Sequence, residues 1–134
     1  MATFLLSDHN CEGQVKAIIA SLRELGFLEL LDLELLFFKD VGLSVNADDE
    51  EVWRLCQKQG YYLITANRST KDGAKSLHSV LQQFSTDTSL PVITLSKPER
   101  IILDKRYREA CAETLVEIVL NAELYVGVSR LYIP

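Results

Sequence analysis

Cysteine is scarce in this chain, and its placement excludes two kinds of cross-linked site. The three cysteines, Cys11, Cys56 and Cys111, are an odd number, and no two of them have the C-x-x-C spacing. This pattern argues against a disulfide framework and against a zinc knuckle. His9 lies close to Cys11, but nothing else in the sequence completes a metal or nucleophile site around them. Reduced, mostly buried thiols in a cytoplasmic protein are therefore expected.

Long apolar runs are also missing. The most apolar stretch, Leu28 to Phe38, is too short for a membrane span and contains Glu29, Asp32 and Glu34. The first six residues are apolar, but they lack the basic residues of a signal peptide and are soon followed by Asp8. We expect no association with a membrane.

The chain has no excess of positive charge. Its net charge is −5, whereas proteins that bind nucleic acid over a broad surface usually carry a basic footprint. A nucleic-acid enzyme whose acidic site is neutralised by a metal is not excluded by this charge. No linker rich in proline, glycine or serine divides the 134 residues, so we expect one domain spanning residues 1–134.

Apolar residues switch repeatedly between the spacing of strands and the spacing of helices. The expected strands are 3–6, 31–38, 61–64, 90–95 and, at a sheet edge, 131–133, and the expected helices are 12–25, 49–59, 74–84 and 105–123. A short helix within 28–38 stays open as an alternative, and 96–103 is expected to be irregular. This order predicts a three-layer α/β fold, with a mostly parallel sheet of four to five strands flanked by helices.

Polar side chains follow two of the expected strands and open the helix between them. They are Asp8 and Asn10 after the first strand, Thr65 and Asn67 after the third, and Asp48 and Asp49 at the helix start. Ligands of parallel sheets gather outside the carboxyl ends of the strands. If these side chains converge there, their oxygen atoms suit a hard cation such as Mg²⁺. Such an ion can activate water and clamp a phosphodiester.

These segments, together with Pro91 to Leu95, resemble the PIN-like nuclease superfamily, and in particular its compact branch of small, mostly uncharacterised bacterial proteins. In that branch the first strand ends in Asp-x-Asn, and an Asp opens a helix that has a small residue seven positions later. A Thr-x-Asp motif then ends the next strand. Asp49, Cys56, Thr65 and Asn67 fall on this spacing, and the likeness covers most of the first 95 residues.

The resemblance implies a Rossmann-like sheet with an acidic centre, and RNA cleavage that depends on Mg²⁺ or Mn²⁺. By position, the catalytic and metal-ligating acids would be Asp8 and Asp49, with Asn67 as a further ligand and Asn10, Thr65 and Asp48 in support. Some relatives act as toxins in toxin–antitoxin pairs. RNA is therefore the expected substrate, and the apolar tail after Tyr125 is where an antitoxin-like partner or a second copy would dock.

The chain departs from the family pattern at Asn67, where the family usually has Asp, and at Ser69, where an acid often follows. A unit charge pair about 4 Å apart interacts by roughly 4 kcal/mol at an effective dielectric of 20, so losing one acid weakens a metal site substantially. The alternative is a catalytically degenerate module that binds protein or nucleic acid. Arg68 and Lys71 in the next loop are candidate phosphate contacts, although loop cations are often only solvated.

The acidic and polar residues also have ordinary structural explanations. Asp8 would cap the helix that follows it, since Asp is a good N-cap residue. Asp48 to Glu51 would match the dipole at a helix start. Thr65 and Asn67 would be turn residues after a strand. The positions of these residues relative to one another in the fold decide between such structural roles and a shared metal site.

Overall fold

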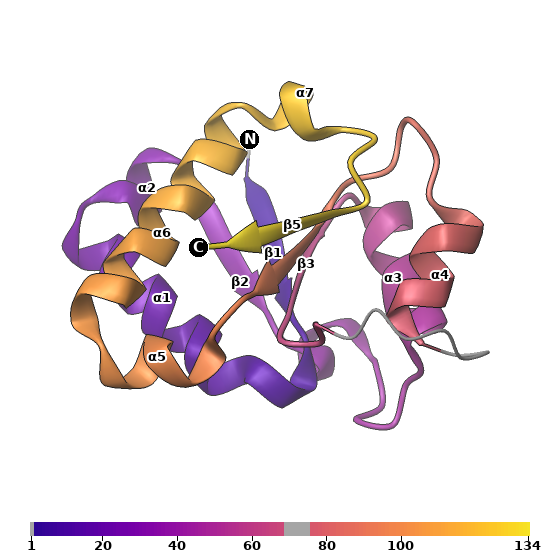
Figure 1. Ribbon diagram of the computed structural model, residues 1–134, viewed down its shortest axis with the longest axis horizontal. Helices are drawn as coiled ribbons and strands as arrows, with labels where there is room; N and C mark the ends of the chain where they lie inside the picture. Colours follow the sequence, from indigo (N-terminus) through magenta and orange to yellow (C-terminus); the bar gives the residue numbers. More distant parts are fainter. Residues whose placement is uncertain (1, 69–75) are drawn as a thin grey trace.

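The computed structural model describes residues 2–68 and 76–134 (Figure 1). Within these residues, five strands form one parallel sheet in the order β2-β1-β3-β4-β5. Their bounds are β1 Thr3–Ser7, β2 Leu33–Leu36, β3 Tyr62–Thr65, β4 Val92–Leu95 and β5 Arg130–Ile133. The expected parallel sheet is confirmed, and its last strand lies at one edge beside β4.

Helices cover both faces of the sheet, which confirms the three-layer α/β architecture. Their bounds are α1 Glu12–Glu24, α2 Phe27–Leu30, α3 Asp49–Gln59, α4 Leu77–Phe84, α5 Pro98–Leu103, α6 Lys105–Leu120 and α7 Ala122–Tyr125. In Figure 1, α1, α2, α5 and α6 lie on one side of the sheet, and α3 and α4 lie on the other. We call these two sides the α6 face and the α3 face.

Alternation along the strands divides the apolar residues between two cores. Leu5, Tyr62 and Ile64 belong to the core of the α6 face. The residues next to them, Leu6 and Leu63, belong to the core of the α3 face. Both kinds of position are apolar because a parallel sheet is covered on both sides, and this is why the strands read as continuous apolar runs.

The chain reverses its direction of travel across the sheet between β1 and β3. It passes from β1 through α1 to β2, and then returns through α3 to β3 on the opposite side of β1. Helices on either side of such a point leave a crevice outside the carboxyl ends of the two strands, where ligands of this architecture bind. The polar strand ends identified in the sequence lie at this point.

Local sequence signals explain the start and the end of α3. Asp48 is the N-cap, and its side chain accepts a hydrogen bond from the backbone N–H of Glu51 at 2.9 Å. Gly60 ends the helix with a φ of 76°, a left-handed conformation that costs glycine little. Val52, Trp53 and Cys56 are the residues that α3 buries.

Segment 96–103, expected to be irregular, is instead largely helical. Pro98 stands at the first turn of α5, where its missing N–H would have no partner in any helix and its fixed φ suits the helix. The expected helix 105–123 ends earlier, at Leu120, and is followed by the short α7. The first residues of the expected helix 74–84 lie outside the described residues.

No helix in residues 2–68 and 76–134 is both long enough and apolar enough to cross a membrane.

Candidate functional site

A cleft of about 410 Å³ lies at the carboxyl ends of β1 and β3 on the α3 face. It is lined by Asp8, His9, Asn10, Phe38, Val45, Ala47, Asp49, Ala66 and Asn67. Three segments that are far apart in the sequence therefore meet at one place. Four of the candidate metal ligands and supporting residues named from the sequence, Asp8, Asn10, Asp49 and Asn67, are among the lining residues. We call this site the acidic cleft.

Thr65 fixes the carboxylate of Asp8. The hydroxyl of Thr65 donates a hydrogen bond to Oδ2 of Asp8 at 2.8 Å, and its Oγ1 accepts one from the backbone N–H of Asn67 at 3.0 Å. Thr65 is only 1% exposed, so the donor of this contact is buried while its acceptor faces the cleft. The alternative that Asp8 caps the following helical turn is wrong for its side chain, which makes no capping hydrogen bond there. Thr65 thus supports the cleft from below rather than lining it.

Asp49 and Asp48 have different surroundings although they are neighbours. Asp49 is half-buried, and its pKa is raised, first by burial and then by the negative charge of Asp8. A backbone hydrogen bond from Leu77 and the positive charge of Arg130 act in the opposite direction. Asp48 caps α3 from an exposed position and is not among the lining residues of the cleft. Asp49 is therefore the acid of this pair that faces Asp8.

Arg130 is the residue of this region that the sequence analysis missed. Its Nη1 donates hydrogen bonds to the backbone oxygen of Asn67 and, at 3.1 Å, to the hydroxyl of Thr94. Its Nη2 is buried and has no hydrogen-bond partner among the described residues. Burial lowers the pKa of Arg130, while Tyr132 and Asp49 raise it. The strand alternation of β5 was the available signal, because it places Arg130 on the opposite face from the apolar Leu131.

Of the two expected phosphate contacts, only Arg68 lies within the described residues, and it does not line the acidic cleft. Arg68 is exposed, and its Nη1 donates a hydrogen bond to the backbone oxygen of Ser96. Lys71 lies outside the described residues, as does Ser69. A role in phosphate binding stays a prediction for both basic residues.

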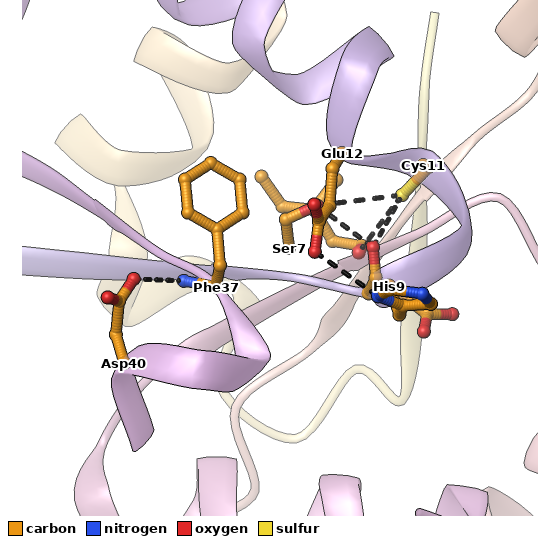
Figure 2. A network of polar contacts seen from close by, with 8 residues as sticks. Ser7, His9, Cys11, Glu12, Phe37 and Asp40 are labelled. Carbon is orange, nitrogen blue, oxygen red and sulfur yellow. Dashed lines mark hydrogen bonds and ion pairs between the residues drawn. The ribbon is translucent and has the colours of Figure 1, made fainter. Parts of the chain in front are cut away.

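His9 and Cys11 do not form a reactive pair. Figure 2 shows the contacts around Ser7, His9, Cys11 and Glu12. The thiol of Cys11 contacts the backbone oxygens of Asp8 and Ile64, each at 3.6 Å, and burial raises its pKa to about 12. His9 instead lies 3.4 Å from a carboxylate oxygen of Glu12. A thiol with so high a pKa is a poor nucleophile near neutral pH.

Comparison with protein-family models, with curated proteins and with solved structures finds no match for this chain. Its parallel sheet and α/β layers are compatible with a PIN-like domain.

Proposed function

We propose that this chain is a PIN-like ribonuclease that works with Mg²⁺ or Mn²⁺ held by Asp8 and Asp49. The observation that carries the proposal is that these two carboxylates, from the end of β1 and the start of α3, line one cleft at the point where the sheet reverses direction. Asn10 and Asn67 add amide groups to the same cleft.

The donor set suits a hard cation that keeps other ligands of its own. Apart from the imidazole of His9, whose Nδ1 lies 3.4 Å from a carboxylate oxygen of Glu12, every polar side chain that lines the cleft is a carboxylate or an amide. Mg²⁺ usually takes one or two protein carboxylates while retaining water or substrate phosphate oxygens. Among the described residues, no group of three or more His, Cys, Asp or Glu side chains is arranged to hold a metal. A two-carboxylate site therefore fits better than a fully protein-ligated one.

The charges of the cleft also favour a cation. Asp8 raises the pKa of Asp49, which means that the two negative charges repel each other in a partly buried place. A divalent ion would remove this repulsion. When bound, it would supply an activated water and a clamp for the phosphodiester. The protein would contribute a fixed Asp8 carboxylate, held by Thr65, and a fixed position for Asp49 at the first turn of α3.

The test is cleavage of mixed single-stranded and structured RNA in the presence of Mg²⁺ or Mn²⁺. Asp8→Asn and Asp49→Asn each remove one charge with little change of shape, so each should lower the rate by about 100-fold or more, given roughly 4 kcal/mol per unit charge at 4 Å. Asp87→Asn is the control, because Asp87 is an exposed acid in a loop away from the cleft. Absence of cleavage by the wild type with both metals, or equal cleavage by Asp8→Asn, would refute the proposal.

A second candidate is a degenerate module that keeps the fold and binds a partner without catalysis. The observation that favours it is Asn67 where the resembling family has an acid, together with the fixed positive charge of Arg130 close to Asp49. Calorimetry with millimolar Mn²⁺ separates the two candidates, because a degenerate site should give no heat. Asn67→Asp sharpens the result, since activity gained by that variant alone would identify a natural site that had lost it.

The expected antitoxin-like partner or homodimer stays a prediction. β5 lies at the edge of the sheet, where a strand from another chain would pair with it.

A further inference from the structure

A second hollow, of about 240 Å³, lies on the α3 face between α4 and β5. It is lined by His78, Leu81 and Gln82 of α4, and by Ser129, Arg130 and Tyr132 in and next to β5. We call it the β5 groove. None of its lining residues lines the acidic cleft, so it is a separate feature of the same face.

The register of β5 explains why this groove combines a cation with an aromatic ring. Arg130 pairs with Val92 and Tyr132 pairs with Thr94 in the parallel ladder. Val92 belongs to the core of the α3 face, so alternation puts Arg130 and Tyr132 on that face as well. Tyr132 is 47% exposed, which is unusual for an aromatic side chain on a covered sheet face. The groove beside α4 therefore has a half-exposed aromatic ring next to the partly buried side chain of Arg130.

Arg130 connects the groove to the acidic cleft. Its side chain lines the groove, and its Nη1 donates to the backbone oxygen of Asn67, whose residue lines the cleft. The Nη2 group is buried without a partner among the described residues. A buried donor with no acceptor is rare in folded proteins. A phosphate oxygen entering from the groove would satisfy it after a small rotation of the flexible side chain.

We propose that the β5 groove binds the nucleotide next to the scissile phosphate of a single-stranded RNA. Arg130 contacts the backbone phosphate between the groove and the acidic cleft, and the base stacks on Tyr132. This assignment rests on the function proposed for the cleft, and it adds the strand type and the path of the substrate. It also supplies the phosphate contact that the sequence had suggested for Arg68 and Lys71.

The chemistry of the groove favours an unpaired strand over a duplex. Stacking on a protein aromatic ring needs a base that has left the helical stack, which single strands provide and duplexes do not. The Nη2 group of Arg130 is charged and has no partner among the described residues, so it can donate a charge-assisted hydrogen bond to a phosphate oxygen. Because the whole chain carries a net charge of −5, affinity must come from such local contacts rather than from a broad positive field.

The experiment measures fluorescence polarisation of a labelled single-stranded RNA dodecamer in EDTA, so that no cleavage occurs. Tyr132→Ala should weaken binding about 10-fold, as expected for one lost base–aromatic stack. Arg130→Gln should weaken it by a similar factor and lower the slope of log affinity against log salt by about 0.7, the value for one phosphate contact to a single strand. Arg23→Gln and Tyr125→Phe, both on the α6 face, are the matched controls and should bind like the wild type.

Several outcomes would overturn the assignment. They are no binding of the single strand by the wild type, equal binding of the duplex of the same sequence, and wild-type affinity in both Tyr132→Ala and Arg130→Gln. Adenosine monophosphate that competes at the concentration of the RNA itself would indicate a mononucleotide site instead. Since Tyr132 is half exposed, its variant should fold even if Arg130→Gln does not.

The binding assay does not depend on turnover, so it separates the two proposals. Binding that is lost in Tyr132→Ala, in a protein that never cleaves RNA, would refute only the ribonuclease. Metal-dependent cleavage with binding unchanged in both variants would refute only the groove.

Discussion

The two faces of the sheet differ most at the carboxyl ends of the strands. On the α6 face the apolar core continues to the strand ends, and Ser7 and Cys11 are buried there together. On the α3 face the next residue along, Asp8, faces a polar cleft with Asp49. One step along β1 therefore separates the core from the candidate site. A strand end in a doubly wound sheet can serve stability on one face and chemistry on the other.

The helices explain why, in the part of the chain that the structure describes, the strand ends open into the polar cleft on the α3 face. On the α6 face, α5 follows β4 and packs against α1, and its Ile101 is fully buried. On the α3 face, α3 and α4 begin at the edge of the cleft, so their first residues line or approach it rather than fill it. Helix starts favour negative charge, which makes Asp49 less costly there than at another position of a partly buried surface.

The largest expected change in the free energy of unfolding comes from the core of the α6 face. Leu115 of α6 is fully buried in the core of the α6 face. Leu115→Ala should lower the free energy of unfolding by about 3 kcal/mol, because it leaves a cavity in a packed core. Urea denaturation would measure this loss. At a temperature where the variant is still folded, its affinity for Mn²⁺ should equal that of the wild type.

A loss below about 1 kcal/mol for Leu115→Ala would contradict the division between the faces, since it would mean that this core collapses around the cavity or carries little of the stability. Leu115→Met, which roughly conserves the volume, is the matched control and should cost less than about 1.5 kcal/mol.

The fold was predictable from the sequence because its signals are local and repeated. Val15, Ile18, Ile19 and Leu22 mark one face of α1, and the runs at β1, β3 and β4 lie between polar or turn residues. The convergence of Asp8 and Asn67 was also predictable, because parallel strands place their carboxyl ends at one edge of the sheet. These inferences need only the spacing of apolar residues, the residues that start and end each element, and the handedness of the connections between strands.

Features that depend on contacts between distant segments could not be read in the same way. α5 was missed because Pro98 indicates a turn as well as a helix start, and only its packing against α1 decides between them. Arg130 was missed because its contact with Asn67 joins two segments that no spacing rule connects. Asp49 was preferred over Asp48 only through the family resemblance, since which of them faces Asp8 depends on where α3 begins.

The second prediction concerns the hydrogen bond between Thr65 of β3 and Asp8, below the acidic cleft on the α3 face. Thr65→Val keeps the shape of the side chain but removes the hydroxyl that bonds Asp8 and accepts from Asn67. It should lower the free energy of unfolding by about 1–2 kcal/mol, because a partly buried N–H loses its acceptor and a carboxylate loses its donor. Urea denaturation at pH 7 measures the change. Thr65→Ser keeps the hydroxyl and should recover most of the loss.

A double-mutant cycle would show whether the hydroxyl acts through Asp8. Thr65→Val should cost less in an Asp8→Ala background than in the wild type, since the carboxylate partner is then absent. Equal costs in the two backgrounds would assign the whole effect to the Asn67 backbone and remove Thr65 from the support of the cleft.

The smallest expected effect is an increase in the free energy of unfolding, and it tests the charges of the acidic cleft. Burial and Asp8 raise the pKa of Asp49 above its ordinary value of 3.8. Well below pH 3.8 the carboxyl is protonated in the folded and unfolded chains alike and costs nothing. As the pH rises, the unfolded chain releases its proton first, so the folded state loses stability until the pH passes the raised pKa. Asp49→Asn should therefore be more stable than the wild type at pH 7.

The gain should stay below about 1 kcal/mol, because Asp49 is half-exposed and water screens its charge. Urea denaturation across pH 3.5–8 should show the difference growing with pH, and Asp48→Asn should show none, since Asn caps a helix as well as Asp does. Millimolar Mn²⁺ should reverse the order by stabilising only the wild type. Asp49→Asn could instead be less stable than the wild type at pH 7 without metal. Stabilisation of the Asp49 charge by Arg130 and the backbone of Leu77 would then outweigh the cost of its burial and of its repulsion by Asp8. The cleft would then be a neutralised structural site, with no surplus charge left to attract a cation.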